Sequence, residues 1–176
     1  MKYFLDFGAY TGDTVQDFYE RPETFGTSDP KEYQVFAFEP ARIGHWIYPG
    51  VEWVEKAAWI KDEKMTFYFG GDFCYGGEQN QSATIVRDGK PPLEGPTREV
   101  ECFDFDKFIS RLDGEIIVKM DIEGAEFPIL EKLIKTGNIN KITRLYVEFH
   151  NYRYKDGDSR RTAIINKLTI PYEEWH

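Results

Sequence analysis

The chain opens with a short apolar segment that runs into a loop with two spaced glycines. Residues 3–5 are apolar, Asp6 follows them, and the loop carries Gly8 and Gly12 before a helical pattern starts at Asp13. Glycines let the main chain come close to a ligand, and the free N–H groups of the first helical turn then face that ligand. This strand–loop–helix unit predicts an α/β fold that holds a nucleotide-like molecule.

The loop differs from the fingerprint of dinucleotide-binding domains. It lacks the third glycine of G-x-G-x-x-G, and it carries an acid, Asp6, at the end of the strand. An anionic loop suits a cationic ligand better than a pyrophosphate, because like charges repel. Both differences argue against a nicotinamide-dependent oxidoreductase.

Short apolar segments alternate with helical segments along the chain. This order predicts a mostly parallel, twisted sheet with helices on both faces, and the length of 176 residues predicts a single domain over residues 1–176. The predicted strands cover residues 2–6, 34–38, 51–57, 65–69, 98–102, 115–121 and 144–149. The predicted helices cover residues 13–20, 105–112, 125–135 and 159–168.

Residues 70–97 do not follow this order. The segment is rich in glycine and proline pairs and has few periodic apolar positions. A loop of this length in a compact domain is usually functional or mobile. We interpret it as a substrate loop or lid, with a disordered insert as the alternative.

Acidic and small residues follow two of the predicted strands. In a parallel α/β sheet, ligands bind at the carboxyl ends of the strands. Glu39 follows the predicted strand 34–38 and precedes Pro40, and at that position its carboxylate can accept hydrogen bonds from both hydroxyls of a ribose. Helix capping or solvent exposure is the alternative for Glu39. Ala57 and Ala58 leave room for a flat base, although core packing explains two alanines equally well.

Ionisable residues also end two later strands. Asp121 follows the apolar residues 116–118, and Glu148 and His150 alternate onto one face of the next strand. We expect these three residues in one crevice as catalytic groups, because a buried acid at a strand end needs a partner or a function. Glu123 and Glu126 are explained by a favourable interaction with the helix dipole.

The composition limits the choice of partners. A formal net charge of −9 disfavours a nucleic-acid partner, since such binding requires a basic face. The sequence shows no leader pattern before the first strand and no apolar segment of membrane-spanning length. We therefore expect a cytoplasmic protein without a membrane partner.

Taken together, the motifs resemble those of the FkbM-type S-adenosylmethionine-dependent methyltransferases, which are class I enzymes with a Rossmann-like fold. The most specific motif is KMDIEGAE at residues 119–126, followed by the E-P pair at 39–40. The others are DFGAYTGDT at 6–14, FEP at 38–40, KAA at 56–58, DKFI at 106–109 and VEFH at 147–150.

The resemblance implies a binding site for S-adenosylmethionine. It places Asp6, Gly8 and Gly12 beside the methionine part of the cofactor and Glu39 on the ribose. It places Ala57 and Ala58 near the adenine and Asp121 near the reacting methyl group. The whole set of expected cofactor-binding residues is Asp6, Gly8, Ala9, Tyr10, Gly12, Asp13, Thr14, Glu39, Pro40, Ala57, Ala58 and Asp121.

Many members of this family methylate hydroxyls of sugars or of natural products built on them. We expect in-line O-methylation of a sugar or glycan, with His150 as the general base and Asp121 or Glu148 orienting it. Alternatively, Asp121, Glu148 and His150 hold a divalent ion. The other hypothesis is a catalytically silent Rossmann-like binding or assembly module.

The sequence departs from the family at both ends. It begins at the first strand, and it ends soon after residues 170–175, where a sixth strand would begin. We expect a minimal fold, truncated at the C-terminal edge, that lacks the antiparallel last strand. The open edge would be covered by a second subunit of a homo-oligomer.

Overall fold

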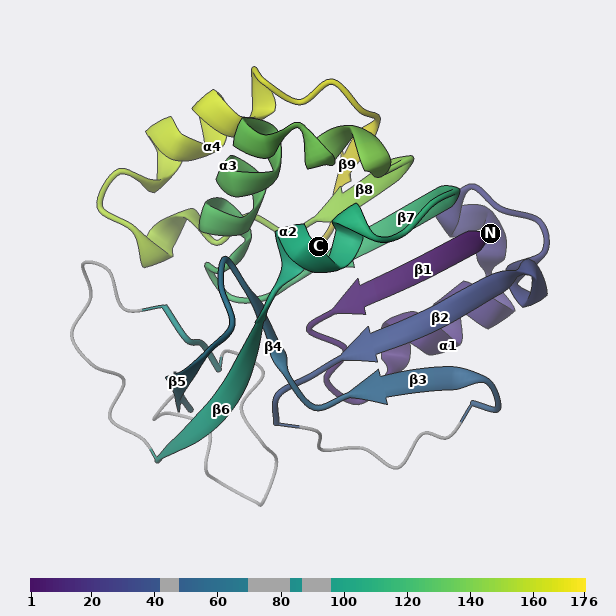
Figure 1. Ribbon diagram of the computed structural model, residues 1–176, viewed down its shortest axis with the longest axis horizontal. Coiled ribbons are helices and arrows are strands. Elements are labelled where there is room, and N and C mark those ends of the chain that lie inside the picture. The colour runs from purple at the N-terminus through teal and green to yellow at the C-terminus, as the bar shows by residue number, and fades with distance from the viewer. Residues whose placement is uncertain (42–47, 70–82, 87–95) are drawn as a thin grey trace.

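A computed structural model of the chain describes residues 1–41, 48–69, 83–86 and 96–176. Within these ranges the strands form a six-stranded sheet and a smaller three-stranded sheet (Figure 1). The smaller sheet lies on the side toward which β1 (Lys2–Phe7), β2 (Tyr33–Phe38) and β3 (Val51–Val54) of the main sheet point. No helix among the described residues is long and apolar enough to cross a membrane.

The main sheet has the strand order β3-β2-β1-β7-β8-β9, and all of its described strand pairs are parallel. This arrangement confirms the predicted α/β fold. The order reverses at β1, which pairs with β2 on one side and β7 on the other, so a crevice is expected at their carboxyl ends. The strands are β1 (Lys2–Phe7), β2 (Tyr33–Phe38), β3 (Val51–Val54), β7 (Glu115–Met120), β8 (Arg144–Val147) and β9 (Tyr172–Glu174).

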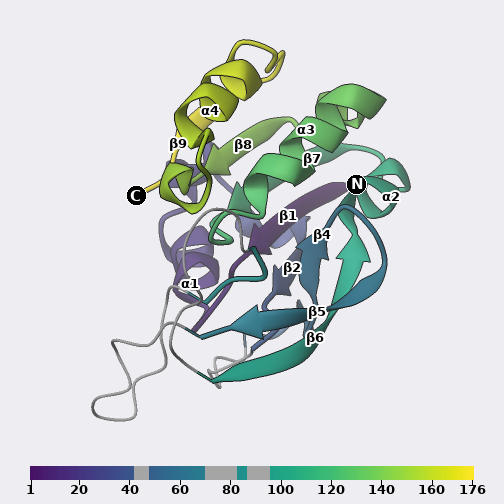
Figure 2. The ribbon, with the colours of Figure 1, turned by 90° about the vertical axis from the view of Figure 1, so that its left-hand side faces the viewer.

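Helices cover both faces of this sheet (Figure 2). On one face, Phe18 of α1 packs against Phe4 of β1, with the two rings stacked 3.9 Å apart. On the other face, Phe127 and Leu130 of α3 join a cluster with Val118 of β7. The α-helices are α1 (Asp13–Glu20), α2 (Phe105–Ser110), α3 (Glu126–Thr136) and α4 (Gly157–Ile165). The 3-10 helices are η1 (Pro22–Phe25), η2 (Pro30–Glu32), η4 (Asn138–Lys141) and η5 (Asn151–Arg153).

The smaller sheet corrects one predicted strand. Residues 51–57 were expected to form one strand, but β3 ends at Val54 and a new strand starts at Ala57. The N–H of Lys56 donates to the carbonyl of Val54 and closes a tight turn between them. In the smaller sheet β6 (Thr97–Asp104) pairs in parallel with β4 (Ala57–Trp59) and antiparallel with β5 (Glu63–Tyr68).

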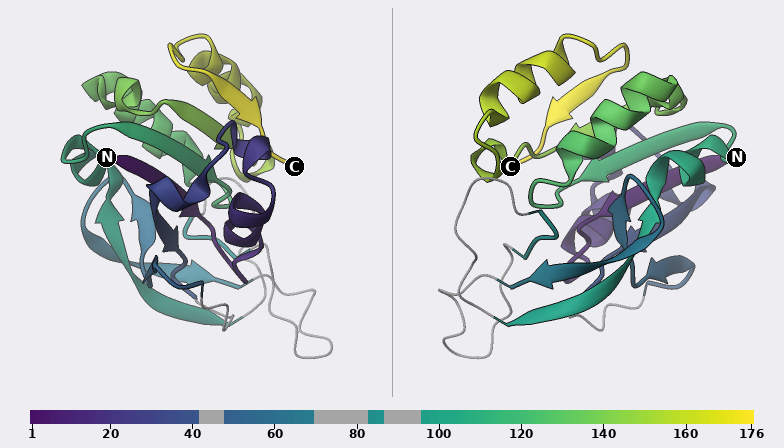
Figure 3. Two further views of the ribbon diagram at one scale, coloured as in Figure 1. Left: turned by 90° about the vertical axis from the view of Figure 1, so that its right-hand side faces the viewer. Right: turned by 60° about the vertical axis from the view of Figure 1, so that its left-hand side comes forward.

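The expected open edge after residues 144–149 is also corrected. A three-residue parallel strand, β9, pairs with β8 there (Figure 3), with Leu145 opposite Tyr172. The N–H of Trp175 extends the pairing to the carbonyl of Val147. β9 is not evident from sequence patterns, because a strand of three residues with two glutamates carries no apolar pattern.

Candidate active site

A cavity of about 510 Å³ opens at the carboxyl ends of β1, β2, β7 and β8. Its size is typical of ligand-binding pockets. The loop after β1, the end of β2, the start of β4 and the segment after β7 all contribute to its wall. It therefore lies where ligands bind in open α/β sheets.

The loop after β1 is held tightly between its two neighbouring strands. The N–H groups of Gly8 and Ala9 both donate to the carbonyl of Phe38, at 3.1 and 3.2 Å. Gly8 has a φ of +80°, and a Cβ built on it would lie 1.8 Å from the carbonyl oxygen of Asp121. Glycine is therefore required at position 8 by the approach of the segment after β7, in addition to any approach of a ligand.

Glu39 lies at the cavity wall in a fixed orientation. Its side chain is almost entirely buried, and its two carboxylate oxygens accept hydrogen bonds from the N–H groups of Ala41 at 2.9 Å and Tyr10 at 3.2 Å. Burial raises the pKa of Glu39, and these two hydrogen bonds partly offset the shift. The alternative of a solvent-exposed Glu39 is not what the structure shows.

Most of the expected cofactor-binding residues line the described part of this cavity. Those that line it are Gly8, Ala9, Tyr10, Asp13, Thr14, Glu39, Pro40, Ala57, Ala58 and Asp121. Asp6 and Gly12 do not line it. Gly12, with a φ of +95°, instead supports the turn into α1.

Asp6 lies fully buried beside the cavity, next to a buried lysine. Lys119 places its Nζ 3.5 Å from Oδ1 of Asp6, 3.5 Å from Oδ2 of Asp121 and 3.5 Å from the carbonyl of Gly8. Burial raises the pKa of Asp6 to about 6, although the charge of Lys119 opposes the shift. A lysine thus bridges two of the acids that the sequence analysis selected.

The structure brings Asp121, Glu148 and His150 together, and it adds two glutamates to the group. Glu126, which is fully buried, faces Nδ1 of His150 at 3.2 Å and accepts the N–H of His150 at 2.7 Å. The carboxylate that orients the ring is therefore Glu126, in place of the expected Asp121 or Glu148.

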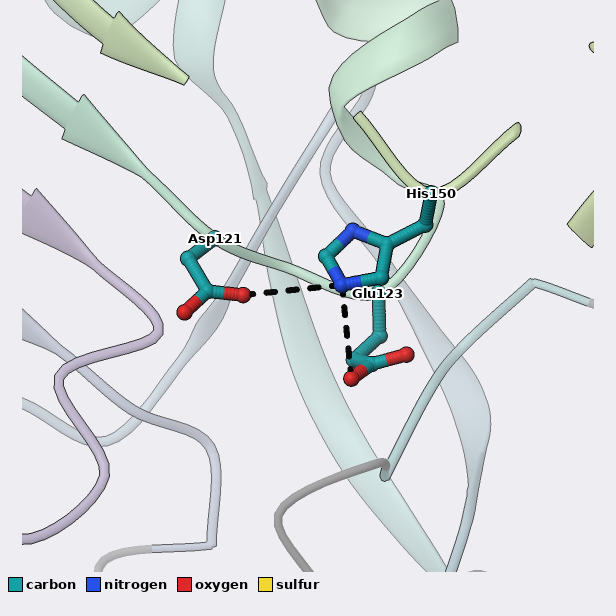
Figure 4. A group of neighbouring side chains, drawn as sticks. All are labelled: Asp121, Glu123 and His150. Carbon is teal, nitrogen blue, oxygen red and sulfur yellow. Dashed lines mark ion pairs between the residues drawn. The ribbon is translucent and has the colours of Figure 1, made fainter. Parts of the chain in front are cut away.

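The other ring nitrogen of His150 faces three carboxylates. Nε2 lies 3.4 Å from Glu123, 3.7 Å from Asp121 and 3.8 Å from Glu148, and Figure 4 shows the first two of these contacts. Burial alone would lower the pKa of His150, but its interactions with the carboxylates of Glu123 and Glu126 outweigh burial and raise the pKa to about 10. The general-base role expected for His150 stays a prediction that this environment does not favour.

Glu123 is the site residue that the sequence analysis missed. It is a non-glycine residue with a φ of +53°, a conformation that is sparsely populated and is often found at functional sites. Its Oε2 accepts hydrogen bonds from Arg153 at 2.6 Å and from Tyr152 at 2.7 Å. The available signal was its place in KMDIEGAE, where dipole stabilisation of α3 seemed a sufficient explanation.

The smaller sheet supplies an apolar wall to the same cavity. Phe67 and Phe69 line it together with Ile85, a residue within the predicted lid. Thr84 pairs with Tyr68 through two backbone hydrogen bonds, which joins this segment to β5. The rest of the predicted lid, residues 70–82 and 87–95, lies outside the described residues.

Comparison with known proteins agrees with this geometry. A sequence model of the Methyltransferase FkbM domain matches residues 6–169, which is nearly the whole chain and includes every site residue above. Comparisons with curated proteins and with solved structures gave no significant match. On the match over residues 6–169, the chain belongs to the FkbM methyltransferase domain family.

Proposed function

We propose that this protein is an S-adenosylmethionine-dependent methyltransferase that methylates a hydroxyl oxygen of a sugar or glycan. The observation that carries the proposal is the buried carboxylate of Glu39, fixed at the wall of a cavity at the carboxyl ends of β1 and β2. A carboxylate at this position is suited to a ribose, because it accepts hydrogen bonds from two neighbouring hydroxyls.

The residues around Glu39 fit the remaining parts of the cofactor. Ala57 and Ala58 are buried, line the cavity and leave space for a flat adenine. Among the described residues of the cavity wall, carboxylates outnumber lysines, which favours a cationic sulfonium over a pyrophosphate. The acids are Asp13, Glu39, Asp121, Glu123 and Glu148, and the lysines are Lys56 and Lys119.

S-adenosylmethionine, when bound, supplies a methyl group on a positively charged sulfur. The residues of the chain have to hold the acceptor oxygen in line and take its proton as the new C–O bond forms. Asp121 and Glu148 present carboxylates to the cavity and are suited to accept this proton, whereas Nε2 of His150 is enclosed by carboxylates. Positioning is typically worth about 7–11 kcal/mol of the barrier, and a general base about 10²–10⁴ in rate.

A sugar acceptor is supported by the family resemblance and by one exposed aromatic ring. Tyr152 is 48% exposed, and its ring lies 5.8 Å from that of His150. A half-exposed aromatic ring beside a site of this kind is suited to contact a sugar ring. Transfer of a labelled methyl group to a panel of oligosaccharides, with amine and thiol acceptors for comparison, tests the acceptor class. Labelled product from the amine or thiol acceptors and none from the oligosaccharides would contradict it.

The silent binding module is the weaker hypothesis. It depended on an open sheet edge after residues 144–149, and β9 pairs along that edge. A module without catalysis also has no need for Asp121, Glu148 and His150 to meet at one cavity. No observation on the described residues favours it over an enzyme.

Ligand-dependent stabilisation tests the proposed cofactor. We expect S-adenosylmethionine and S-adenosylhomocysteine to raise the unfolding free energy by about 2.7 kcal/mol at a hundredfold excess over Kd, and NAD to have no effect. Glu39→Gln removes a charged acceptor, so cofactor affinity measured by calorimetry should fall by about 10- to 100-fold.

Glu52→Gln is the matched control, because Glu52 is exposed on the neighbouring strand β3 and should leave affinity unchanged. Stabilisation by NAD alone, or unchanged affinity in a folded Glu39→Gln variant, would contradict the proposal.

A further inference from the structure

We propose that Asp121, Glu123 and His150 form a binding site for one divalent cation, of the class that accepts mixed carboxylate and imidazole ligands, such as Mn²⁺. The site is distinct from the expected set of Asp121, Glu148 and His150, because Glu123 takes the place of Glu148 as a ligand. Its role in catalysis rests on the proposed methyltransferase function, whereas its existence does not.

The spacing of the ligand atoms fits a shared ion better than direct hydrogen bonds. One ligand atom from each of the three residues lies within 4.8 Å of the other two. Nε2 of His150 lies 3.4 Å from Glu123 and 3.7 Å from Asp121, beyond the usual 2.7–3.2 Å of an N–H···O hydrogen bond. Ligands that each lie about 2.0–2.2 Å from one ion are separated by about 3–4 Å.

A second contact orients each ligand from behind. Nδ1 of His150 faces the buried carboxylate of Glu126, which in turn accepts the N–H of Gly124 at 2.8 Å. A carboxylate on the far nitrogen is the usual support of a metal-binding histidine, because it fixes the ring and raises its basicity. It leaves Nε2 directed at the shared point (Figure 4), where a bound ion would take the place of the Nε2 proton, which is released to solvent.

The two acids are supported in the same way. Arg153 and Tyr152 hold Oε2 of Glu123, so that Oε1 faces Nε2 of His150. Lys119 lies 3.5 Å from Oδ2 of Asp121, and Oδ1 is the oxygen nearer the histidine. Each of the three residues therefore turns one heteroatom toward the protein and the other toward a common centre.

Burial and charge both point to a cation at this centre. The side chain of His150 is 5% exposed, yet its Nε2 is aimed between carboxylates with none at normal hydrogen-bond distance. Glu148 approaches to 3.8 Å from the cavity side. Three carboxylates this close repel one another, and a divalent ion relieves that repulsion.

The centre is accessible from the cavity, which gives the ion a role. Asp121, Glu123, Glu148 and His150 all line the cavity. An acceptor hydroxyl that coordinated the ion would have a lower pKa and would lose its proton more easily to Glu148. The acceptor oxygen would then bond to the methyl carbon of S-adenosylmethionine as the bond between that carbon and the sulfur breaks. In this arrangement Glu148 is a base beside the ion, and Asp121, Glu123 and His150 remain its ligands throughout the reaction.

Manganese binding to the chelator-treated chain, followed by electron paramagnetic resonance, tests the site without any turnover. We expect one Mn²⁺ per chain. Loss of a ligand should cost at least as much as loss of a supporting residue, so the affinity should fall by at least about 10- to 100-fold in both Glu123→Gln and His150→Gln. Glu52→Gln, an exposed acid on β3, is the control that should bind as the unchanged protein does. Circular dichroism confirms that each variant is folded, and a variant that unfolds is replaced by Asp121→Asn.

Absence of Mn²⁺ binding to the unchanged protein, or binding that survives in the folded ligand variants, would overturn the site. Stabilisation by S-adenosylhomocysteine is measured in parallel, so that a failed cofactor pocket is seen separately from a failed metal site. If the ion binds but methyl transfer is insensitive to chelation, the catalytic role is overturned.

Discussion

Asp6 lies one residue before the end of β1 with its side chain fully buried, and neither of its carboxylate oxygens has a hydrogen-bond partner among the described residues. Lys119 is close enough for an ion pair but does not compensate the loss of water, because the pKa of Asp6 is raised to about 6. An ionised Asp6 therefore lowers stability at neutral pH. A residue that costs stability in this way is usually retained for function.

Asp6→Asn should make the protein more stable at neutral pH. Between about pH 4 and pH 6 the folded state keeps a proton on Asp6 that the unfolded state loses, so stability falls as the pH rises through this range. The variant lacks this titration. We expect an unfolding free energy higher by about 1–3 kcal/mol at pH 7.5, no difference near pH 3.5, and weaker binding of S-adenosylmethionine. Chemical denaturation at both pH values measures the effect, and a variant less stable than the unchanged protein at pH 7.5 would contradict the interpretation.

Sequence patterns identified single residues well where one chemical explanation dominated. Glu39 was predicted from its place after a strand, and it lies at the cavity wall. Glu123 and Glu126 were explained by the helix dipole, and nothing in the sequence distinguishes a dipole interaction from a contact with a histidine 24 or more residues away. Such contacts depend on how β7 and β8 pair, which is a tertiary property.

At the scale of elements, the loop after β1 and the segment after β7 form one unit. The N–H of Asp121 donates to the carbonyl of Phe7 at 3.0 Å, and Gly8 approaches the carbonyl of Asp121 too closely for any side chain. Residues that line opposite sides of the cavity are thereby fixed relative to one another. The site depends on this contact as much as on its polar side chains.

Gly8→Ala should separate these two segments. The added Cβ would clash with the carbonyl oxygen of Asp121, and alanine would have to adopt the positive φ of position 8, which is unfavourable for any residue with a side chain. We therefore expect a loss of stability of about 2–5 kcal/mol together with loss of cofactor binding. Gly50→Ala is matched for backbone strain, with a φ of +90° and no atom within 4 Å of the added carbon, and should cost about 1–2 kcal/mol. Equal losses in the two variants, measured by urea denaturation, would show that the contact is unimportant.

The elements that were predicted wrongly have weak or ambiguous patterns. Residues 51–57 were predicted as one continuous strand, and the break at Lys56 comes from a tight turn without glycine or proline. The partner of β4 is β6, which lies some 40 residues further along and on the far side of a long insertion. Periodicity within a strand does not reveal which sheet the strand joins.

At the scale of the whole molecule, the order of strands and helices was enough to predict a parallel sheet with helices on both faces, because buried strands and amphipathic helices each leave a clear periodic signal. The carboxyl ends of those strands then brought the predicted acids to one cavity. The smaller sheet was not predictable as a separate sheet, because the pairing of its strands depends on distant partners, and β9 was not predictable because its three residues carry no apolar pattern. The proposed function thus depends on one interaction at the cavity, between Glu39 and a bound ribose.

A crystal structure with S-adenosylhomocysteine tests this interaction most directly. We predict that both ribose hydroxyls lie within hydrogen-bonding distance of the Glu39 carboxylate, with the adenine beside Ala57 and Ala58. A ribose bound elsewhere, with Glu39 making no contact to it, would contradict the account.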